Sequence, residues 1–243
     1  MTISDKINYY HFRNDRFQYT IHNYDYFTTN YGIRNDTILG EIYEYSVMLK
    51  LLNKIDQSKA IIDVGGNCGL FCIPCSLYGY NVFAFEPISM NLELLRLSKE
   101  SNNCETLQIV PFGLLDENKK ETIYIPYCSD NTSFNKDVAI SNMSKKDYIE
   151  EVVECITFDK WIGENPSVDV GFIKIDVQGF EKQVLDGMSN FLSNCSDVYI
   201  FLEWDRRHTE QVGNTLEGIQ NLLSEFGFNE IENLGNDKLF YKN

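Results

Sequence analysis

Long apolar runs are missing from this chain of 243 residues, although 43% of its residues are hydrophobic. No window approaches the roughly 20 consecutive apolar residues that a membrane helix needs. The opening MTISDKINYYHF also lacks the basic segment followed by an apolar one that marks a signal peptide. We therefore expect a globular protein that acts in the cytoplasm and has no membrane partner.

Positive charge is scarce as well. The chain has 21 basic and 36 acidic residues, which gives a net charge of −15. A surface of this charge repels a phosphate backbone, so we expect no nucleic-acid partner. A small molecule or a neutral glycan is the expected partner, and a homo-oligomer remains open.

The seven cysteines have no disulfide-framework spacing, and their odd number suits a reducing compartment. Cys68, Cys72 and Cys75 stand at C-x3-C-x2-C, a spacing with which three thiolates hold an iron–sulfur cluster in radical enzymes. The same spacing places them along one face of a helix expected over residues 69–78, spread over about 10 Å. A cluster needs its sulfurs at one point, whereas buried cysteines pack as small hydrophobic residues. Core packing is therefore favoured, and a cluster-dependent radical enzyme is the alternative.

Short apolar runs alternate with helical periods from residue 40 onward. This alternation predicts an α/β fold with a doubly wound, mostly parallel, Rossmann-like sheet. Two closing runs separated by GND predict an antiparallel terminal hairpin at its edge. We expect Pro74 to kink the first helix after the first strand and Ser89 to cap the next helix. The expected strands are 60–64, 81–85, 106–110, 170–177, 198–204, 228–234 and 238–242, and the expected helices are 41–55, 69–78, 89–101, 180–192 and 213–226.

Two segments stand apart from this alternation. Residues 1–39 are rich in Tyr, Phe, Asn and Asp without a clear period, and we expect an N-terminal cap or extension there. Residues 116–157 interrupt the pattern with ETIYIP and EEVVECITF, which predict an inserted hairpin around a polar loop. Residues 40–243 are then expected to form one α/β domain that contains this insertion.

A glycine-rich turn joins the first strand to its helix. The segment DVGGNCG contains Asp63, Gly65, Asn67 and Gly69, residue types that allow a ligand to approach the backbone closely. Glu86 ends the second strand, where a carboxylate can accept both hydroxyls of a ribose. The G-x-G-x-x-G spacing of NAD enzymes is absent, and Asp63 would repel a pyrophosphate. Its charge suits the cationic methionine end of S-adenosylmethionine, which the pattern therefore favours.

Three segments resemble the signature of the FkbM family of methyltransferases. They are IIDVGGNCGLF, VFAFEP and FIKIDVQGFEKQVLDGM, and the third is the most specific. The similarity extends from about Gly40 to Tyr241 and weakens over 116–150 and after Trp204. The resemblance implies a class I methyltransferase domain over 40–243 with S-adenosylmethionine as its cofactor. Gln178 departs from the family pattern, which has Glu at that position.

The resemblance also implies roles for individual residues. Asp176, at the end of the fourth parallel strand, would lie near the transferred methyl group. Phe112 and Gly113 would border the adenine of the donor. The residues expected at its methionine end are Asp63, Gly65, Asn67 and Gly69, with Glu86 at its ribose.

Such enzymes commonly methylate hydroxyl groups, often on sugars, and we predict O-methylation of a small molecule or glycan. The catalytic candidates are Asp176, as the base or the group that positions the acceptor, and Glu203, which ends its strand. Glu181, Arg206 and His208 are weaker candidates for substrate contact.

Structural roles compete with each assignment. Asp176 would cap the following helix or orient the donor, Glu181 would be a first-turn charge, and Glu203 would pair with Arg206. We predict no metal, although Asp176, Glu181, Glu203 and Asp205 would suit a divalent cation if the fold brought them together. A non-catalytic nucleotide-binding protein on the same fold is the remaining alternative.

Overall fold

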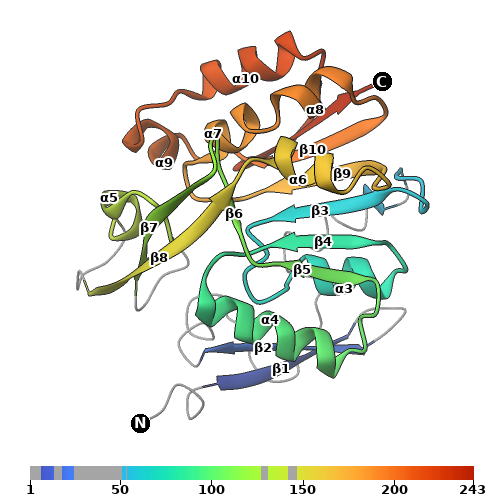
Figure 1. Ribbon diagram of the computed structural model, residues 1–243, viewed down its shortest axis with the longest axis vertical. Helices are drawn as coiled ribbons and strands as arrows, with labels where there is room; N and C mark the ends of the chain where they lie inside the picture. The colour runs from blue at the N-terminus through green and yellow to red at the C-terminus, as the bar shows by residue number, and fades with distance from the viewer. Residues whose placement is uncertain (1–6, 14–17, 25–50, 53, 127–130, 142–146) are drawn as a thin grey trace. The chain divides into compact units, whose positions relative to one another are not determined.

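The computed structural model describes residues 7–13, 18–24, 51–52, 54–126, 131–141 and 147–243. The chain forms two compact units, residues 1–111 and 112–243 (Figure 1). The boundary expected after residue 39 and most of the helix expected over 41–55 lie outside the described residues. The division into an extension and a methyltransferase domain therefore stays a prediction.

Three parallel strands form the sheet of the first unit. Strand β4 (Val82–Phe85) pairs with β3 (Ala60–Val64) on one side and with β5 (Leu107–Val110) on the other. Every residue of β3 and β4 is buried, as expected for parallel strands that are covered on both faces. All three strands lie within the ranges that the sequence predicts.

Two helices follow the first two of these strands. Helix α3 (Cys72–Leu77) begins three residues later than expected, so Pro74 lies in its first turn. A helix has no need of an N–H there, and the predicted kink is wrong. Helix α4 (Ser89–Ser101) has the expected bounds, but Ile88 occupies its N-cap and no side chain caps it. The prediction of Ser89 as the cap is therefore also wrong.

An antiparallel pair, β1 (Ile7–Arg13) and β2 (Gln18–Tyr24), precedes this sheet in the chain. Strand β2 contacts α4. The backbone of Thr20 donates to Asn102 Oδ1 at 2.7 Å, and Asn102 Nδ2 donates to the Thr20 carbonyl at 2.6 Å. These two bonds join the hairpin to the C-terminal end of α4.

The second unit contains the other four of the seven predicted strands. Strand β9 (Val170–Ile175) pairs in parallel with β10 (Val198–Glu203), and β12 (Asp237–Lys242) pairs with β10 in the antiparallel sense. Strand β11 (Asn229–Asn233) pairs with β12, which confirms the terminal antiparallel hairpin. With the parallel strands and helices of both units, the predicted Rossmann-like fold class is confirmed.

The helices of this unit are short. The helix expected over 180–192 is divided into α7 (Glu181–Asp186) and α8 (Ser189–Asn194). Helix α9 (Arg206–Gln211) forms where no helix was expected. The others are the one-turn α5 (Lys136–Ala139), α6 (Phe158–Glu164) and α10 (Leu216–Glu225).

A long hairpin precedes β9 in the chain (Figure 1). Strand β7 (Lys119–Pro126) pairs with β8 (Tyr148–Ile156) in the antiparallel sense, and the short β6 (Gly113–Leu114) pairs with β8 in parallel. Between β7 and β8 the backbone of Ser133 pairs with Tyr124, just before helix α5 (Lys136–Ala139). This bridge holds the described part of the loop against β7.

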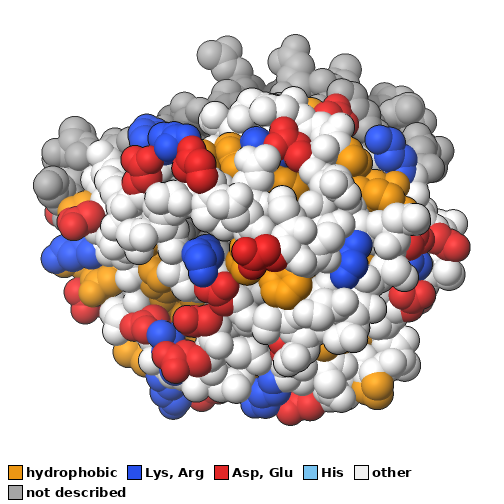
Figure 2. Space-filling model, turned by 90° about the horizontal axis from the view of Figure 1, so that it is seen from above, with side chains coloured by type: hydrophobic (Ala, Val, Ile, Leu, Met, Phe, Trp, Pro, Cys, Tyr) orange, Lys and Arg blue, Asp and Glu red, His pale blue; other side chains and the backbone are white. Residues whose placement is uncertain are grey.

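Acidic and basic side chains are interspersed over the face drawn in Figure 2. Among the described residues, the large hydrophobic side chains that are exposed are Ile149, Val152 and Ile231. None of the described helices has the length and apolar character required to cross a bilayer.

Candidate functional site

The glycine-rich turn after β3 closes against the end of β4. Gly65, Asn67 and Gly69 have positive φ angles of 87°, 46° and 102°. The backbone N–H groups of Gly65 and Gly66 both donate to the Phe85 carbonyl at 3.0 Å. A side chain at Gly69 would crowd Ile73, because a Cβ there would lie 2.7 Å from Ile73 Cγ1. The turn therefore needs these residue types for its backbone path.

Glu86 joins this turn to the end of β4. Its carboxylate accepts from the Asn67 N–H through Oε2 and from the Ile88 N–H through Oε1, each at 2.9 Å. The side chain is buried, and this burial raises the pKa of Glu86 to about 7. The structure thus places the strand-ending acid directly beside the turn, in the same unit.

The cysteines lie behind this turn. Cys68, Cys72 and Cys75 are each 0% exposed, which confirms that they pack in the core. Cys68 precedes α3 in the turn, so the expected helical stripe contains only two of the three. Burial, and then the negative charge of the buried Asp63 carboxylate, raises the pKa of the Cys72 thiol.

A pair of carboxylates lies at the carboxyl ends of β9 and β10 in the second unit. Asp176 follows β9 and Glu203 ends β10, so the parallel pairing puts both at one edge of the sheet. The side-chain amide of Gln178 donates to Asp176 Oδ1 at 2.9 Å and to both Glu203 oxygens at 3.2 Å. The structure therefore brings together the two predicted catalytic residues. It adds Gln178, which the sequence marked only as a departure from the family pattern.

The pair lies in an acidic environment. Burial, and then the negative charges of Asp176 and three further carboxylates, raise the pKa of Glu203 well above its usual range. Lys174 provides a positive charge, with its Nζ 3.4 Å from Asp176 Oδ2. The further carboxylates are Glu181, Asp237 and Asp205.

Glu181 closes the turn that carries Gln178. It is the first residue of α7, and its Oε1 accepts from the N–H groups of Val177 at 3.3 Å and Gly179 at 3.0 Å. Burial raises the pKa of Glu181 to about 7. Its carboxylate thus faces the backbone of the turn, and substrate contact by Glu181 stays a prediction.

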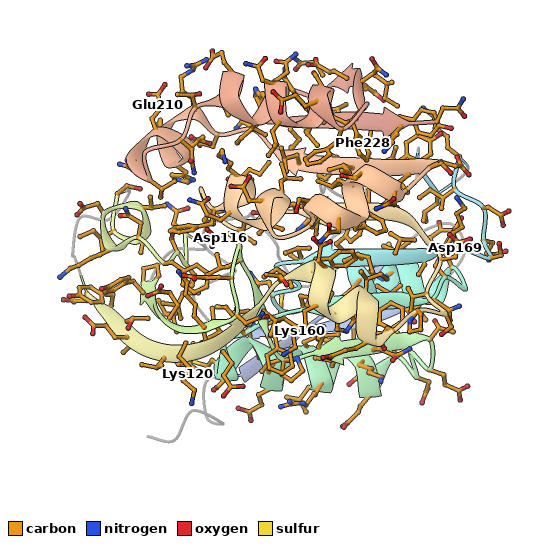
Figure 3. All side chains as sticks on the ribbon, turned by 45° about the horizontal axis from the view of Figure 1, so that its top comes forward. Asp116, Lys120, Lys160, Asp169, Glu210 and Phe228 are labelled. Atoms are coloured by element: carbon orange, nitrogen blue, oxygen red, sulfur yellow. The ribbon has the colours of Figure 1, made fainter. Side chains whose placement is uncertain are left out.

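Arg206 and His208 lie on α9, and their surroundings differ. Arg206 donates to Glu210 and Glu217, each at 3.0 Å, so its predicted pairing with Glu203 is wrong. Glu210, labelled in Figure 3, belongs to the same exposed ion-pair network. His208 is 4% exposed, and the Asp205 carboxylate caps the helix below it.

Two further predictions concern residues of the second unit. Gly113 pairs with Cys155 in β6 and β8, and Phe112 directly precedes it. Their contact with the donor adenine stays a prediction. Among the described residues, no group of three or more His, Cys, Asp or Glu side chains is arranged to hold a metal ion.

Comparison with known proteins identifies the family. Residues 63–230, more than half of the chain, match the methyltransferase FkbM domain. The chain belongs to the FkbM methyltransferase family. This membership confirms the resemblance of the three signature segments, and it makes the chain a methyltransferase that uses S-adenosylmethionine.

The individual relatives share less than a third of their aligned residues with this chain. The chain is 29% identical over 203 residues to the hexuronic acid methyltransferase AglP of Haloferax volcanii, covering 81% of this chain and 75% of AglP. A solved FkbM methyltransferase from Methylobacillus flagellatus KT is 15% identical, with a TM-score of 0.45 over 75% of this chain and 43% of that one. This chain therefore spans less than half the length of that structure. A precorrin-6y C5,15-methyltransferase from Geobacter metallireducens GS-15 is 12% identical, with a TM-score of 0.47 over 84% and 90% of the two chains.

The residues of the first unit suit the donor of this FkbM methyltransferase. Glu86 offers two carboxylate oxygens beside a turn whose backbone leaves no room for larger side chains. The ribose of S-adenosylmethionine presents two hydroxyl donors to such a carboxylate. The cationic methionine end of the same molecule carries the charge that Asp63 would attract. The buried position of Asp63 within β3 places that negative charge immediately before the turn.

Proposed function

We propose that this FkbM methyltransferase methylates a hydroxyl group of a sugar or a related small molecule. The observation that carries the proposal is the carboxylate pair Asp176–Glu203. In the transfer, the acceptor oxygen attacks the sulfonium methyl carbon and forms the new O–C bond. The C–S bond breaks, its electron pair stays on sulfur, and the hydroxyl proton moves to the carboxylate pair.

The pair supports a hydroxyl acceptor because a hydroxyl must lose its proton during transfer. A base is most effective when its pKa lies near the working pH, and burial moves the pKa of Glu203 upward from the usual carboxyl range. The Asp176 side chain is 28% exposed and is the member that we expect to contact the acceptor. An acceptor carboxylate would already be ionised and would need no base.

A sugar acceptor is supported by the relative that is named as a hexuronic acid methyltransferase. The surroundings of the pair nevertheless favour an uncharged sugar at this position. Three carboxylates besides the pair raise the pKa of Glu203. Among the described residues, Lys174 contacts Asp176 and Arg207 contacts Asp205, so these two positive charges face five carboxylates. An anionic acceptor group placed there would add to this repulsion.

The remaining roles are proposals of the same kind. Phe112 and Gly113 border the adenine, Glu86 binds the ribose, and the protein acts in the cytoplasm. Substrate contacts of Arg206 and His208 are secondary to those of Asp176. The methionine end of the donor lies against Asp63, Gly65, Asn67 and Gly69.

The test is methyl transfer from S-adenosylmethionine labelled in its methyl group to a panel of neutral sugars and hexuronic acids. We expect labelled methyl ethers with a neutral sugar. We expect Asp176→Asn and Glu203→Gln to lower kcat by about a hundredfold while calorimetry shows unchanged binding of S-adenosylhomocysteine. Glu210→Gln, on the exposed network, is the matched control. Donor binding without transfer to any sugar of the panel would contradict the proposed sugar acceptor.

A further inference from the structure

The backbone around Gln178 is held in an unusual conformation. Gln178 and Gly179 are consecutive left-handed residues with φ angles of 52° and 99°. Glutamine rarely adopts this conformation, and such residues persist where the surroundings determine them and often where function requires them. The strain here directs the Gln178 side chain toward the two carboxylates.

Three neighbouring elements hold this turn. Ser133, in the segment before α5, donates from its hydroxyl to the Gln178 carbonyl at 3.0 Å. Glu181 of α7 accepts the Gly179 N–H, and a Cβ at Gly179 would lie 2.8 Å from the His208 carbonyl of α9. The rings of Phe134 and Phe180 pack edge to face at 5.3 Å beside it. The position of Gln178 is therefore determined by contacts on several sides.

The carboxylates also determine which way the amide points. An amide nitrogen carries two hydrogens, enough for one bond to each carboxylate, whereas the amide oxygen would repel both. In the observed orientation Gln178 Oε1 is buried and has no hydrogen-bond partner among the described residues. The orientation thus follows from the charges of Asp176 and Glu203.

We propose that Gln178 is a positioning residue whose neutral amide takes the place of a bridging cation between Asp176 and Glu203. The amide holds the two carboxylates at one point without adding a charge that would compete with the incoming proton. The inference rests on the proposed proton transfer to this pair. It assigns to Gln178 the task of holding the two carboxylates together.

Substitution by glutamate tests this role, because it replaces the donor with a third carboxylate of the same shape. The added charge would join those already facing the pair, so Gln178→Glu should move the acidic limb of the kcat–pH profile upward by about one unit. That shift is about a tenfold loss of rate on the acidic side. The titratable and charged groups around the pair are Lys174, Glu181, Asp205, Arg207, His208 and Asp237.

A cation provides a second measurement that needs no acceptor. Calorimetry with Mn²⁺ should show binding to Gln178→Glu and none to the wild-type protein. Gln220→Glu is the matched control, because it adds the same charge at an exposed position of α10 and should leave both measurements unchanged. Gln178→Asn adds no charge, and asparagine tolerates the left-handed conformation. Its shorter side chain holds the carboxylates less well, so Gln178→Asn should move the acidic limb of the kcat–pH profile upward by less than Gln178→Glu does. This variant provides the test if Gln178→Glu does not fold.

The possible failures are distinguishable. Wild-type binding of Mn²⁺, or an unchanged Mn²⁺ response in Gln178→Glu, would overturn the positioning role whatever the reaction is. An unchanged kcat–pH profile in both Gln178 variants would also overturn the positioning role of Gln178. The proposed function would still hold in that case if the wild-type protein methylates a sugar. If no acceptor is methylated, the proposed function fails, and the Mn²⁺ measurement still decides the role of Gln178.

Discussion

The carboxylate of Glu86, the residue after β4, accepts a hydrogen bond at 2.9 Å from the backbone N–H of Asn67, a left-handed residue of the glycine-rich turn. This bond couples the shape of the turn to the ionisation of Glu86. A ribose would bind at the same carboxylate, and donor binding should therefore report on its charge.

Glu86→Gln should weaken the binding of S-adenosylhomocysteine by about tenfold to a hundredfold, because hydrogen bonds to an ionised group contribute about 1.5–3 kcal/mol. In the wild-type protein, binding should weaken as the pH falls below about 7, where Glu86 becomes protonated. In the variant this pH dependence should disappear. Calorimetry between pH 5 and 8 measures both effects, and a variant with unchanged affinity would remove Glu86 from the donor site.

The same residue should give the stability of the protein a pH dependence. Burial raises the pKa of Glu86 from 4.5 to about 7, so between these values the folded protein holds a proton that the unfolded chain releases. The free energy of unfolding should then decrease as the pH rises through this window, by up to about 3 kcal/mol. Urea unfolding at several pH values should show that the free energy of unfolding depends less steeply on pH in Glu86→Gln than in the wild-type protein. An identical pH dependence in the two proteins would mean that Glu86 is ionised throughout this pH window.

Gly187 lies between α7 and α8 at a position that has no room for a side chain. A Cβ at this position would clash with the Leu115 carbonyl oxygen and would lie 3.4 Å from Cα of Asp116, which is labelled in Figure 3. Gly187→Ala should therefore destabilise the protein by about 3 kcal/mol or more, as overpacking against backbone does. Gly163→Ala is the matched control, because a Cβ there meets nothing within 4 Å in α6. Gly163→Ala should raise the free energy of unfolding in urea by about 0.5–1 kcal/mol. Equal effects of the two substitutions would contradict the predicted clash at Gly187.

Gly69 tests the donor turn in a similar way. It shares a positive φ with Gly213, but a Cβ at Gly69 would lie 2.7 Å from Ile73 and 2.9 Å from Leu95, whereas one at Gly213 meets nothing within 4 Å. Gly213→Ala should therefore cost about 1–2 kcal/mol from backbone strain alone. Gly69→Ala should cost about 1–3 kcal/mol more through crowding. Comparable midpoints in urea would show that the turn relaxes around the added methyl group.

The buried cysteines test the alternative of a radical enzyme. Replacing Cys68 and Cys75 by alanine should cost about 1 kcal/mol of stability for each and should leave S-adenosylhomocysteine affinity unchanged. Protein purified without oxygen should be colourless and free of iron. Iron that co-purifies with the wild-type protein and is lost with donor binding in the double variant would favour the cluster.

The alternation of apolar runs and helical periods was sufficient to predict the strands on both sides of Pro111. Each strand is short and buried, so its residues carry the signal locally. The start of α3, the cap of α4 and the break at Gly187 were not predictable in this way. At Gly187 the reason is a contact with Leu115, which lies far away in the sequence.

The glycine-rich turn after β3 could be predicted from the sequence by itself, because its local backbone path requires glycine or asparagine at the positive φ angles of Gly65, Asn67 and Gly69. Binding of the donor at this turn and at Glu86 stays a prediction. The bridge between Asp176 and Glu203 was decided by the tertiary structure alone. Gln178 and Glu203 are 25 residues apart, and they meet because β9 and β10 pair in parallel and end at the same edge. A residue pattern along the chain does not contain that register, which arises from the packing of the strands.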